Sequence, residues 1–214
     1  MRDSGEPALP PIPPAKLVEQ IRPAILSVLV LTVLTGCVFP LLLAAIGRPL
    51  FPHQAGGSLV TRGGTVVGSE LIAQELSRPE YFQSRPSAAG SGYDGTASGG
   101  TNLGPNNPRL KSGAADFAGI RQLAGEYRRR NGLPPDTAVP IDAVTRSGSG
   151  LDPDIGPENA ALQIPRVARA RGLSEEVLRR LVANHTRESQ LGFLGDARVP
   201  VLELNLALDR VKPR

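Results

Sequence analysis

The sequence contains few residues of the types that carry out chemistry. It has two histidines, His53 and His185, and a single cysteine, Cys37, which lies in an uncharged apolar segment. Zinc sites need three or four ligands close together, so no metal site is predicted. A single cysteine also excludes an internal disulfide.

A serine hydrolase site is one catalytic arrangement that these residues could form. It would combine Ser147 or Ser149 with His185 and Asp152. Neither serine lies in a G-x-S-x-G turn, which exposes the nucleophile of many hydrolases. We therefore predict no catalytic residue and keep a membrane-anchored periplasmic hydrolase with a cryptic serine site as the alternative function.

The sequence also lacks the loops that bind phosphate or calcium. The glycine-rich stretch 148–150 is not followed by the lysine and hydroxyl of a G-x-x-x-x-G-K-[ST] loop. Asp152, Asp154 and Glu158 are spaced like part of a calcium loop, but two prolines interrupt the pattern. The net charge of +4 comes from mostly scattered basic residues, and there is no tryptophan, so no nucleic-acid surface is predicted.

The rest of the chain is organised around segment 23–46, which holds no charged residue. About 20 apolar residues in a helix cross the bilayer core of roughly 30 Å, so this segment predicts a transmembrane helix. Pro40 should kink the helix, because it removes a backbone donor. Thr32, Thr35 and Gly36 would let a second helix approach closely, which favours a packed partner over contact with membrane lipid alone.

Two processed forms are alternatives to an uncleaved anchor. Residues 34–37 read Leu-Thr-Gly-Cys, which is similar to a lipoprotein cleavage box with Cys37 as the acylated residue. A lipoprotein would become polar after that cysteine, whereas this chain stays apolar to Ile46. The apolar run is also longer than that of a cleaved signal peptide, about 7 to 15 residues. The pattern favours the uncleaved anchor.

Basic residues beside the span predict its orientation. Lys16 and Arg22 precede it, and segments with an excess of basic residues tend to remain in the cytoplasm. We therefore divide the chain into a cytoplasmic proline-rich tail, 1–22, a transmembrane helix, 23–46, and one periplasmic domain, 47–214.

The periplasmic domain is predicted to be α+β, or α/β, with a small sheet and about four helices. Segment 58–68 has two short apolar runs about Gly63-Gly64, the pattern of a β-hairpin. Segment 199–208 alternates leucine with other residues, which is the period of a strand. Helices are expected from capping residues and apolar spacing at 70–76, 114–131, 157–170 and after Ser174.

A long segment rich in small residues, 84–108, lies inside this domain. Tyr93 and Leu103 interrupt it, so it is not a simple flexible linker. Long loops in compact domains are mostly functional or disordered. We predict an ordered docking loop, in which Gly99 and Gly100 adopt the positive φ values open to glycine, and disorder is the alternative.

Several long motifs are similar to one family. They are VGSELIAQ at 67–74, YFQSRPSAAGSGYDG at 81–95, SGGTNLGPNNP at 98–108 and RSGSGLDPDIGPENAALQIPRVARARGL at 146–173, followed by LVANHTRESQLGFLG and VLELNLALD. Ordered matches of this length are far more specific than a short motif. From Arg22 to Val211 the sequence resembles the C subunit of Kdp-type potassium-transporting ATPases.

The resemblance implies a non-catalytic accessory subunit of a high-affinity potassium uptake complex in the bacterial inner membrane. Its implied partners are a channel-like subunit that binds potassium and a P-type subunit that hydrolyses ATP. The family is also described as a catalytic chaperone that shares ATP with the P-type subunit, which makes Gln163 a candidate nucleotide-binding residue. A periplasmic domain would not meet cytoplasmic ATP, so this implication disagrees with the predicted topology.

Overall fold

A computed structural model describes residues 16–212 of the chain. The chain divides into two compact units, one that ends at Gly56 and one that begins at Gly57. Most of the predicted proline-rich tail, residues 1–15, falls outside the described residues, and its character stays a prediction.

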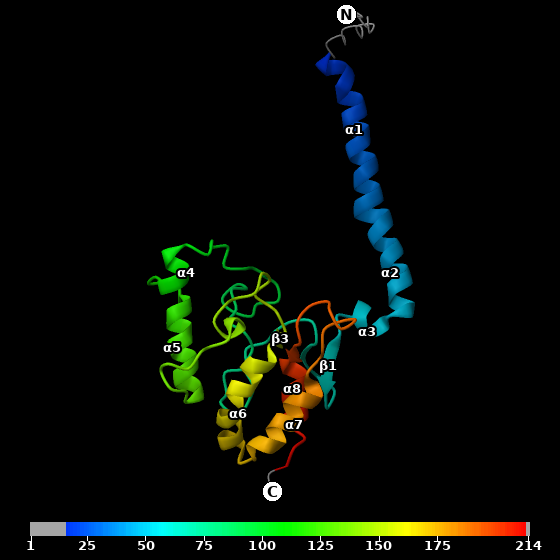
Figure 1. Ribbon diagram of the computed structural model, residues 1–214. Coiled ribbons are helices and arrows are strands. Elements are labelled where there is room, and N and C mark those ends of the chain that lie inside the picture. The colour runs from blue at the N-terminus through cyan, green and yellow to red at the C-terminus, as the bar shows by residue number, and fades with distance from the viewer. Residues whose placement is uncertain (1–15, 213–214) are drawn as a thin grey trace, which may run out of the picture. The chain divides into compact units, whose positions relative to one another are not determined.

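The first unit contains the predicted membrane helix. α1 (Leu17–Val33), a π-helical turn (Leu34–Val38) and α2 (Phe39–Leu50) follow one another without a break, and Figure 1 shows them as one long helix. The 34-residue helix is long and apolar enough to cross a membrane. It begins before segment 23–46 and ends beyond it, so residues 17–22 are also helical. A short helix, α3 (Pro52–Ala55), follows.

The π-helical turn accommodates the proline in this helix. In a regular α-helix the ring of Pro40 would clash with the carbonyl group of Gly36, four residues earlier. Here the Phe39 N–H donates to the Leu34 carbonyl, five residues earlier, which widens the turn just before the proline. The predicted disruption at Pro40 therefore takes the form of a π-bulge inside an unbroken helix.

The second unit begins with the predicted β-hairpin. β1 (Leu59–Arg62) pairs antiparallel with β2 (Thr65–Ser69). Gly63 and Gly64 between them have φ values of 59° and 82°, as a type I′ turn requires at both central positions.

The predicted helix 70–76 is wrong, because an irregular segment occupies these positions. The Ser69 hydroxyl accepts from the Leu71 N–H at 3.1 Å and donates to the Gly57 carbonyl at 2.7 Å, but no helix follows it. The Ala73 N–H donates to the Leu151 carbonyl at 2.9 Å. Hydrogen bonds to distant segments therefore replace the local bonds of a helix.

The predicted helix 114–131 begins later than expected. The chain forms α4 (Pro108–Ser112) and then α5 (Ile120–Asn131). Between them the Ala114 N–H donates to the Phe117 carbonyl at 2.8 Å in a tight turn. Phe117 therefore lies outside the helix, and its ring packs against the guanidinium groups of Arg109 and Arg146.

The next two helices are where the sequence predicts them. A 3₁₀ turn (Ile141–Ala143) is followed by α6 (Pro157–Arg171), which continues through Pro165 without restarting. α7 (Glu175–His185) begins after Ser174, whose hydroxyl accepts a hydrogen bond from the backbone N–H three residues later.

The predicted strand 199–208 is mostly a helix. Only Val199–Pro200 (β4) is extended, and it pairs antiparallel with Asp154–Ile155 (β3), whereas Val201–Leu208 forms α8. Besides the alternation of leucines, which is typical of a strand, the segment also has the spacing of a helix. The buried positions are spaced i, i+3, i+4 and i+7, which is a helical face: Val201, Leu204, Asn205 and Leu208.

The second unit is α+β, as predicted, and its core consists of two hydrophobic clusters. The larger one joins α6, α7 and α8, which lie side by side in Figure 1, to the side chain of Phe82. The smaller one lies between α5 and the 3₁₀ turn and includes Tyr127 and Val144. The segment that follows Phe82 passes along the boundary between the clusters.

Segment 84–108 is held by the fold, in agreement with the prediction of an ordered loop. The Ser87 hydroxyl donates to the Gly150 carbonyl at 2.6 Å, and the Gly99 N–H donates to the Ser149 carbonyl at 2.9 Å. The prediction that Gly99 and Gly100 adopt positive φ values was wrong, because neither residue has a positive φ. Instead, a Cβ on Gly100 would lie 2.8 Å from the carbonyl oxygen of residue 148.

Candidate functional site

Two side-chain amides hold the extended chain at residues 82 and 83. Asn205 on α8 accepts from the Phe82 N–H at 2.9 Å and donates to the Phe82 carbonyl at 2.8 Å. Gln163 on α6 makes the same pair of hydrogen bonds with the Gln83 backbone, at 2.8 and 3.1 Å. These amides supply the bonds that a neighbouring strand would supply. We call Phe82, Gln83, Gln163 and Asn205 the amide clamp.

Gln163, the predicted nucleotide ligand, is 2% exposed. Besides its two bonds to Gln83, its carbonyl accepts from Arg166 at 2.7 Å and its amino group donates to Asn159 at 3.0 Å. A glutamine side chain offers two donor hydrogens and two acceptor lone pairs. All four are used inside the fold.

Arg166 on α6 supports the clamp and is 7% exposed. Its contacts are oxygen atoms of Asn131, Gln163, Pro79 and Tyr81. No carboxylate is hydrogen-bonded to it within residues 16–212, so carbonyl dipoles stabilise its charge. Burial, followed by the charge of Arg130, lowers the pKa of Arg166 to about 10.

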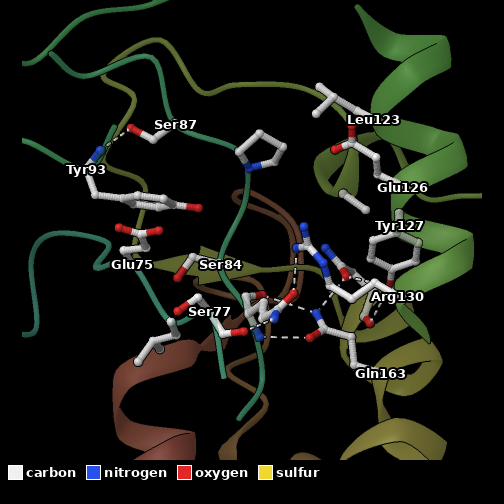
Figure 2. A pocket seen from close by; sticks show the side chains of 15 residues that line it. Glu75, Ser77, Ser84, Ser87, Tyr93, Leu123, Glu126, Tyr127, Arg130 and Gln163 are labelled. Carbon is white, nitrogen blue, oxygen red and sulfur yellow. Dashed lines mark hydrogen bonds between the residues drawn. The ribbon is translucent and has the colours of Figure 1, made fainter. Parts of the chain in front are cut away.

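A cavity of about 320 Å³ lies beside the clamp. Figure 2 shows Glu75 and Tyr93 on one side of it and Tyr127 and Glu126 on the other, with Arg130 between them. Burial, and then the negative charge of Glu75, raises the pKa of Tyr93. Glu75 and Glu126 have no hydrogen bond or ion pair within the described part of the chain.

The cavity contains the groups for polar binding but no nucleophile with an adjacent base. Its hydroxyl groups belong to three serines and two tyrosines, and no histidine or cysteine lines it. Arg130 is partly engaged, because its Nη1 donates to the Gln83 side chain at 2.7 Å. The arrangement can bind a ligand through charge and hydrogen bonds.

The residues of the hypothetical serine site do not come together. The His185 ring nitrogen Nδ1 contacts the Leu181 carbonyl of its own helix at 2.8 Å. Asp152 pairs with Arg85 at 2.7 Å, and the Ser149 hydroxyl accepts from the Leu151 N–H. No hydrogen bond joins serine, histidine and aspartate among the residues that the structure describes.

The acidic residues near 154 are balanced by arginines. Asp152 pairs with Arg85, and Asp154 pairs with Arg198 at 3.0 Å. No group of three or more histidine, cysteine or acidic side chains that could hold a metal occurs within the described residues. Two of the three acids in the calcium-like pattern, Asp152 and Asp154, therefore form ion pairs.

Asp209, which follows α8, forms hydrogen bonds that connect the β-hairpin to α6. It accepts from Arg62 on β1 at 2.6 Å, from Arg171 on α6 at 2.8 Å and from the Tyr81 hydroxyl at 3.1 Å. Burial by itself would raise the pKa of Asp209, but the hydrogen bonds from Arg171, Arg62 and Tyr81 outweigh it and hold the pKa below its usual 3.8.

We expect this carboxylate to make the stability of the chain depend on pH. Because the folded pKa lies below the unfolded one, the contribution of Asp209 is complete above pH 3.8 and is lost as the pH falls through the folded pKa. Urea unfolding of the full chain in detergent should therefore show a smaller loss of stability between about pH 5 and 2 in Asp209→Asn than in the wild type. Equal losses in both proteins would contradict this assignment.

Sequence reasoning missed the amide clamp, although a signal was present. Asn205 lies within the apolar run Leu-Glu-Leu-Asn-Leu-Ala-Leu, and Gln163 lies within Ala-Ala-Leu-Gln-Ile. A polar amide on an apolar helical face must find partners, because leaving it unpaired is costly. Which backbone it would meet could not be predicted.

Comparison with known proteins identifies the family. Residues 21–210 match the family model described as "K+-transporting ATPase, c chain". The chain is 50% identical over 192 residues to the potassium-transporting ATPase KdpC subunit of Mycobacterium tuberculosis H37Rv, covering 90% of this chain and 98% of the relative. It is 46% identical over 210 residues to the protein of the same name from Rhodopseudomonas palustris CGA009, covering 92% and 100%.

A third relative, the KdpC subunit of Koribacter versatilis, is 47% identical over 191 residues, which cover 89% of this chain and 94% of that protein. These matches include both the membrane helix and the second unit. They give no support to the hydrolase alternative. The chain belongs to the KdpC family, the c chain of potassium-transporting ATPases.

Proposed function

We propose that this chain is the accessory subunit of a potassium-transporting ATPase and that it holds the complex together without a catalytic site of its own. The observation that carries the proposal is the family match over residues 21–210, which spans the membrane helix and the second unit as one sequence. The relatives are named as subunits of a potassium-transporting ATPase. His185 contacts its own helix and Asp152 pairs with Arg85, which supports the non-catalytic part of the proposal.

In the proposed arrangement the helix crosses the bacterial inner membrane once, the N-terminus is cytoplasmic and the second unit is periplasmic. Lys16 and Arg22 at the start of the helix support this orientation. The partners are a channel-like subunit that binds potassium and a P-type subunit that hydrolyses ATP. With its main domain outside the cytoplasm, the subunit raises the ATP affinity of its partner through contacts within the membrane rather than by touching the nucleotide.

A nucleotide contact by Gln163 stays a prediction. It would require the amide to exchange one of its four internal hydrogen bonds, and it would require the second unit to lie in the cytoplasm. We therefore propose that Gln163 shapes the wall of the cavity beside the clamp. The side of the membrane on which the second unit lies distinguishes these two roles.

One fusion protein tests the proposal. A reporter that is active only outside the cytoplasm, fused after residue 214 together with an affinity tag, should be active. Affinity purification from the native membrane should recover two larger subunits, identified by mass spectrometry as the potassium-binding and ATP-hydrolysing partners. The fusion protein should retain its full mass, because the anchor is not cleaved.

Three results would contradict parts of this account. A reporter active in the cytoplasm would reverse the orientation and restore nucleotide contact as the favoured role of Gln163. Loss of residues 1–36 with an acylated Cys37 would establish the lipoprotein form. Purification without any transport subunit would refute the assembly role.

A further inference from the structure

The second unit exposes a small group of large apolar side chains at the end of a hairpin. Leu191, Phe193 and Leu194 are 83%, 74% and 48% exposed. They fall within four consecutive residues, which we call the apolar tip (191–194). The other exposed large apolar residues of this unit are separated along the chain: Leu59, Val66, Leu71, Ile141 and Val177.

The tip is held in a fixed shape by backbone hydrogen bonds. Arg187 and Arg198 exchange two N–H to carbonyl bonds at 2.8 and 2.9 Å, and Gln190 and Leu194 exchange two more at 2.9 and 2.8 Å. Leu191 is held at a φ of 54°, a left-handed conformation that costs a leucine roughly 1–2 kcal/mol. The hairpin therefore presents these side chains in a prearranged form, which lowers the ordering cost of binding.

The charges beside the tip favour a protein over a bilayer as its binding partner. The two arginines at the base of the hairpin are already paired, Arg187 with Glu203 and Arg198 with Asp154. Glu188 and Asp196 have no ion pair or hydrogen bond within the described residues, so the unpaired charges there are negative. Bilayers with anionic lipids attract basic segments and repel acidic ones.

The size of the tip indicates an anchor point rather than a whole interface. A stable protein interface buries about 1,000 Å² or more, which three side chains cannot supply. Binding energy is concentrated at a few central residues, and aromatic side chains are enriched among them. A second contact reinforces such a small one when both belong to one chain.

The membrane helix supplies that second attachment. α2 ends at Leu50 and the second unit begins at Gly57. About seven residues reach at most roughly 23 Å, so a short connection joins the second unit to the helix. Any protein surface within that reach meets the tip at a high effective concentration.

We propose that the apolar tip inserts into an apolar pocket, rimmed by lysine or arginine, on the extracytoplasmic face of a membrane-embedded partner subunit. This inference rests on the proposed function for the existence of the complex and adds the surface that makes the contact. Phe193 fills the pocket, Leu191 packs at its edge, and Glu188 and Asp196 face the basic rim.

The double variant Leu191→Asn/Phe193→Ser tests this role. Asparagine adopts positive φ more readily than leucine, and both side chains are exposed, so the thermal unfolding of the purified chain should change little. Recovery of the partner subunits in purification from the native membrane should fall about thirtyfold, as expected when a central anchor is removed. The matched control, Ile141→Ser, changes another apolar residue that is 70% exposed and should leave recovery unchanged.

The wild-type chain separates two kinds of failure. If the wild-type chain itself recovers no transport subunit, the proposed function fails. If the wild-type and tip variants recover the subunits equally well, the docking inference is overturned and the proposed function stands. An equal loss in the Ile141→Ser control would also overturn the inference, because the effect would not be specific to the tip.

A fluorescent probe distinguishes a protein pocket from lipid. The chain has no tryptophan, so Phe193→Trp introduces its only tryptophan, which can be excited apart from the three tyrosines. In vesicles of phosphatidylethanolamine with a minority of phosphatidylglycerol, the chain without partners should show the emission of exposed tryptophan, unquenched by brominated acyl chains. In the assembled complex the emission should shift to the blue. Quenching by brominated lipid without partners, or exposed emission in the complex, would overturn the proposal.

Discussion

Asn205→Leu is expected to destabilise the folded chain by about 2–4 kcal/mol, although the two side chains branch in the same way. The substitution leaves the Phe82 N–H and carbonyl groups buried without partners. Each unsatisfied buried group costs about 1–3 kcal/mol. Since small domains have about 5–15 kcal/mol of stability in total, this change alone should be readily visible in urea unfolding of the full chain in detergent.

Gln163→Leu should have a larger effect than Asn205→Leu. It removes the same two bonds from Gln83 and also leaves Arg166 and Asn159 without one partner each. The double variant should show a non-additive loss, because both amides hold adjacent residues of one segment.

The matched control for these substitutions is Asn184→Leu on α7. Asn184 is exposed, so the same chemical change should alter stability by less than about 0.5 kcal/mol. If Asn205→Leu were as stable as this control, the amide clamp would not contribute to stability. Circular dichroism during unfolding reports the loss of helix in the chain as a whole, to which α6, α7 and α8 contribute.

The elements that the sequence predicted correctly depend on local signals. Gly63-Gly64 specifies its turn through backbone geometry, and Ser174 specifies the start of α7 through its own side chain. The long uncharged run at 23–46 predicts a membrane helix from composition alone. Each of these signals operates within a few residues of the structure it determines.

The elements that were predicted wrongly depend on distant partners. Segment 70–76 has a helical composition, but its backbone bonds to Leu151. Segment 201–208 satisfies a strand period and a helix period equally well, and the tertiary contacts of its buried face, in the larger cluster and with Phe82, select the helix. The amide clamp could not be predicted because its four residues are brought together by helices that are far apart in sequence.

Separating the membrane helix from the second unit should abolish potassium-stimulated ATPase activity of the complex. A membrane helix gains little from meeting another helix through hydrophobicity, because lipid is equally apolar. Within the span, the Thr35 hydroxyl already donates to the Leu31 carbonyl at 2.7 Å, and a Cβ on Gly36 would meet nothing within 4 Å. A partner helix could therefore approach the span closely at Gly36, but it would gain little binding energy there.

The apolar tip is equally small, so neither contact should suffice without the other. Two weak contacts on one chain reinforce each other by about a hundredfold or more, because the second binding step is intramolecular. Deletion of residues 50–214 and expression of residues 50–214 without the span should each lose this reinforcement. Supplying both fragments together should not restore it, since they are no longer covalently joined.

A chain in which segment 23–46 is replaced by an unrelated apolar span of equal length is the informative control. If the span serves only as a tether, this chimera should restore ATPase activity fully, and if the face formed by Thr32, Thr35 and Gly36 packs on a partner helix, activity should be restored only in part. Either fragment by itself restoring full potassium-stimulated activity would contradict the two-contact account. Hydrolysis of ATP by the purified chain without partners would contradict its accessory role, because the proposal gives this chain no catalytic site of its own.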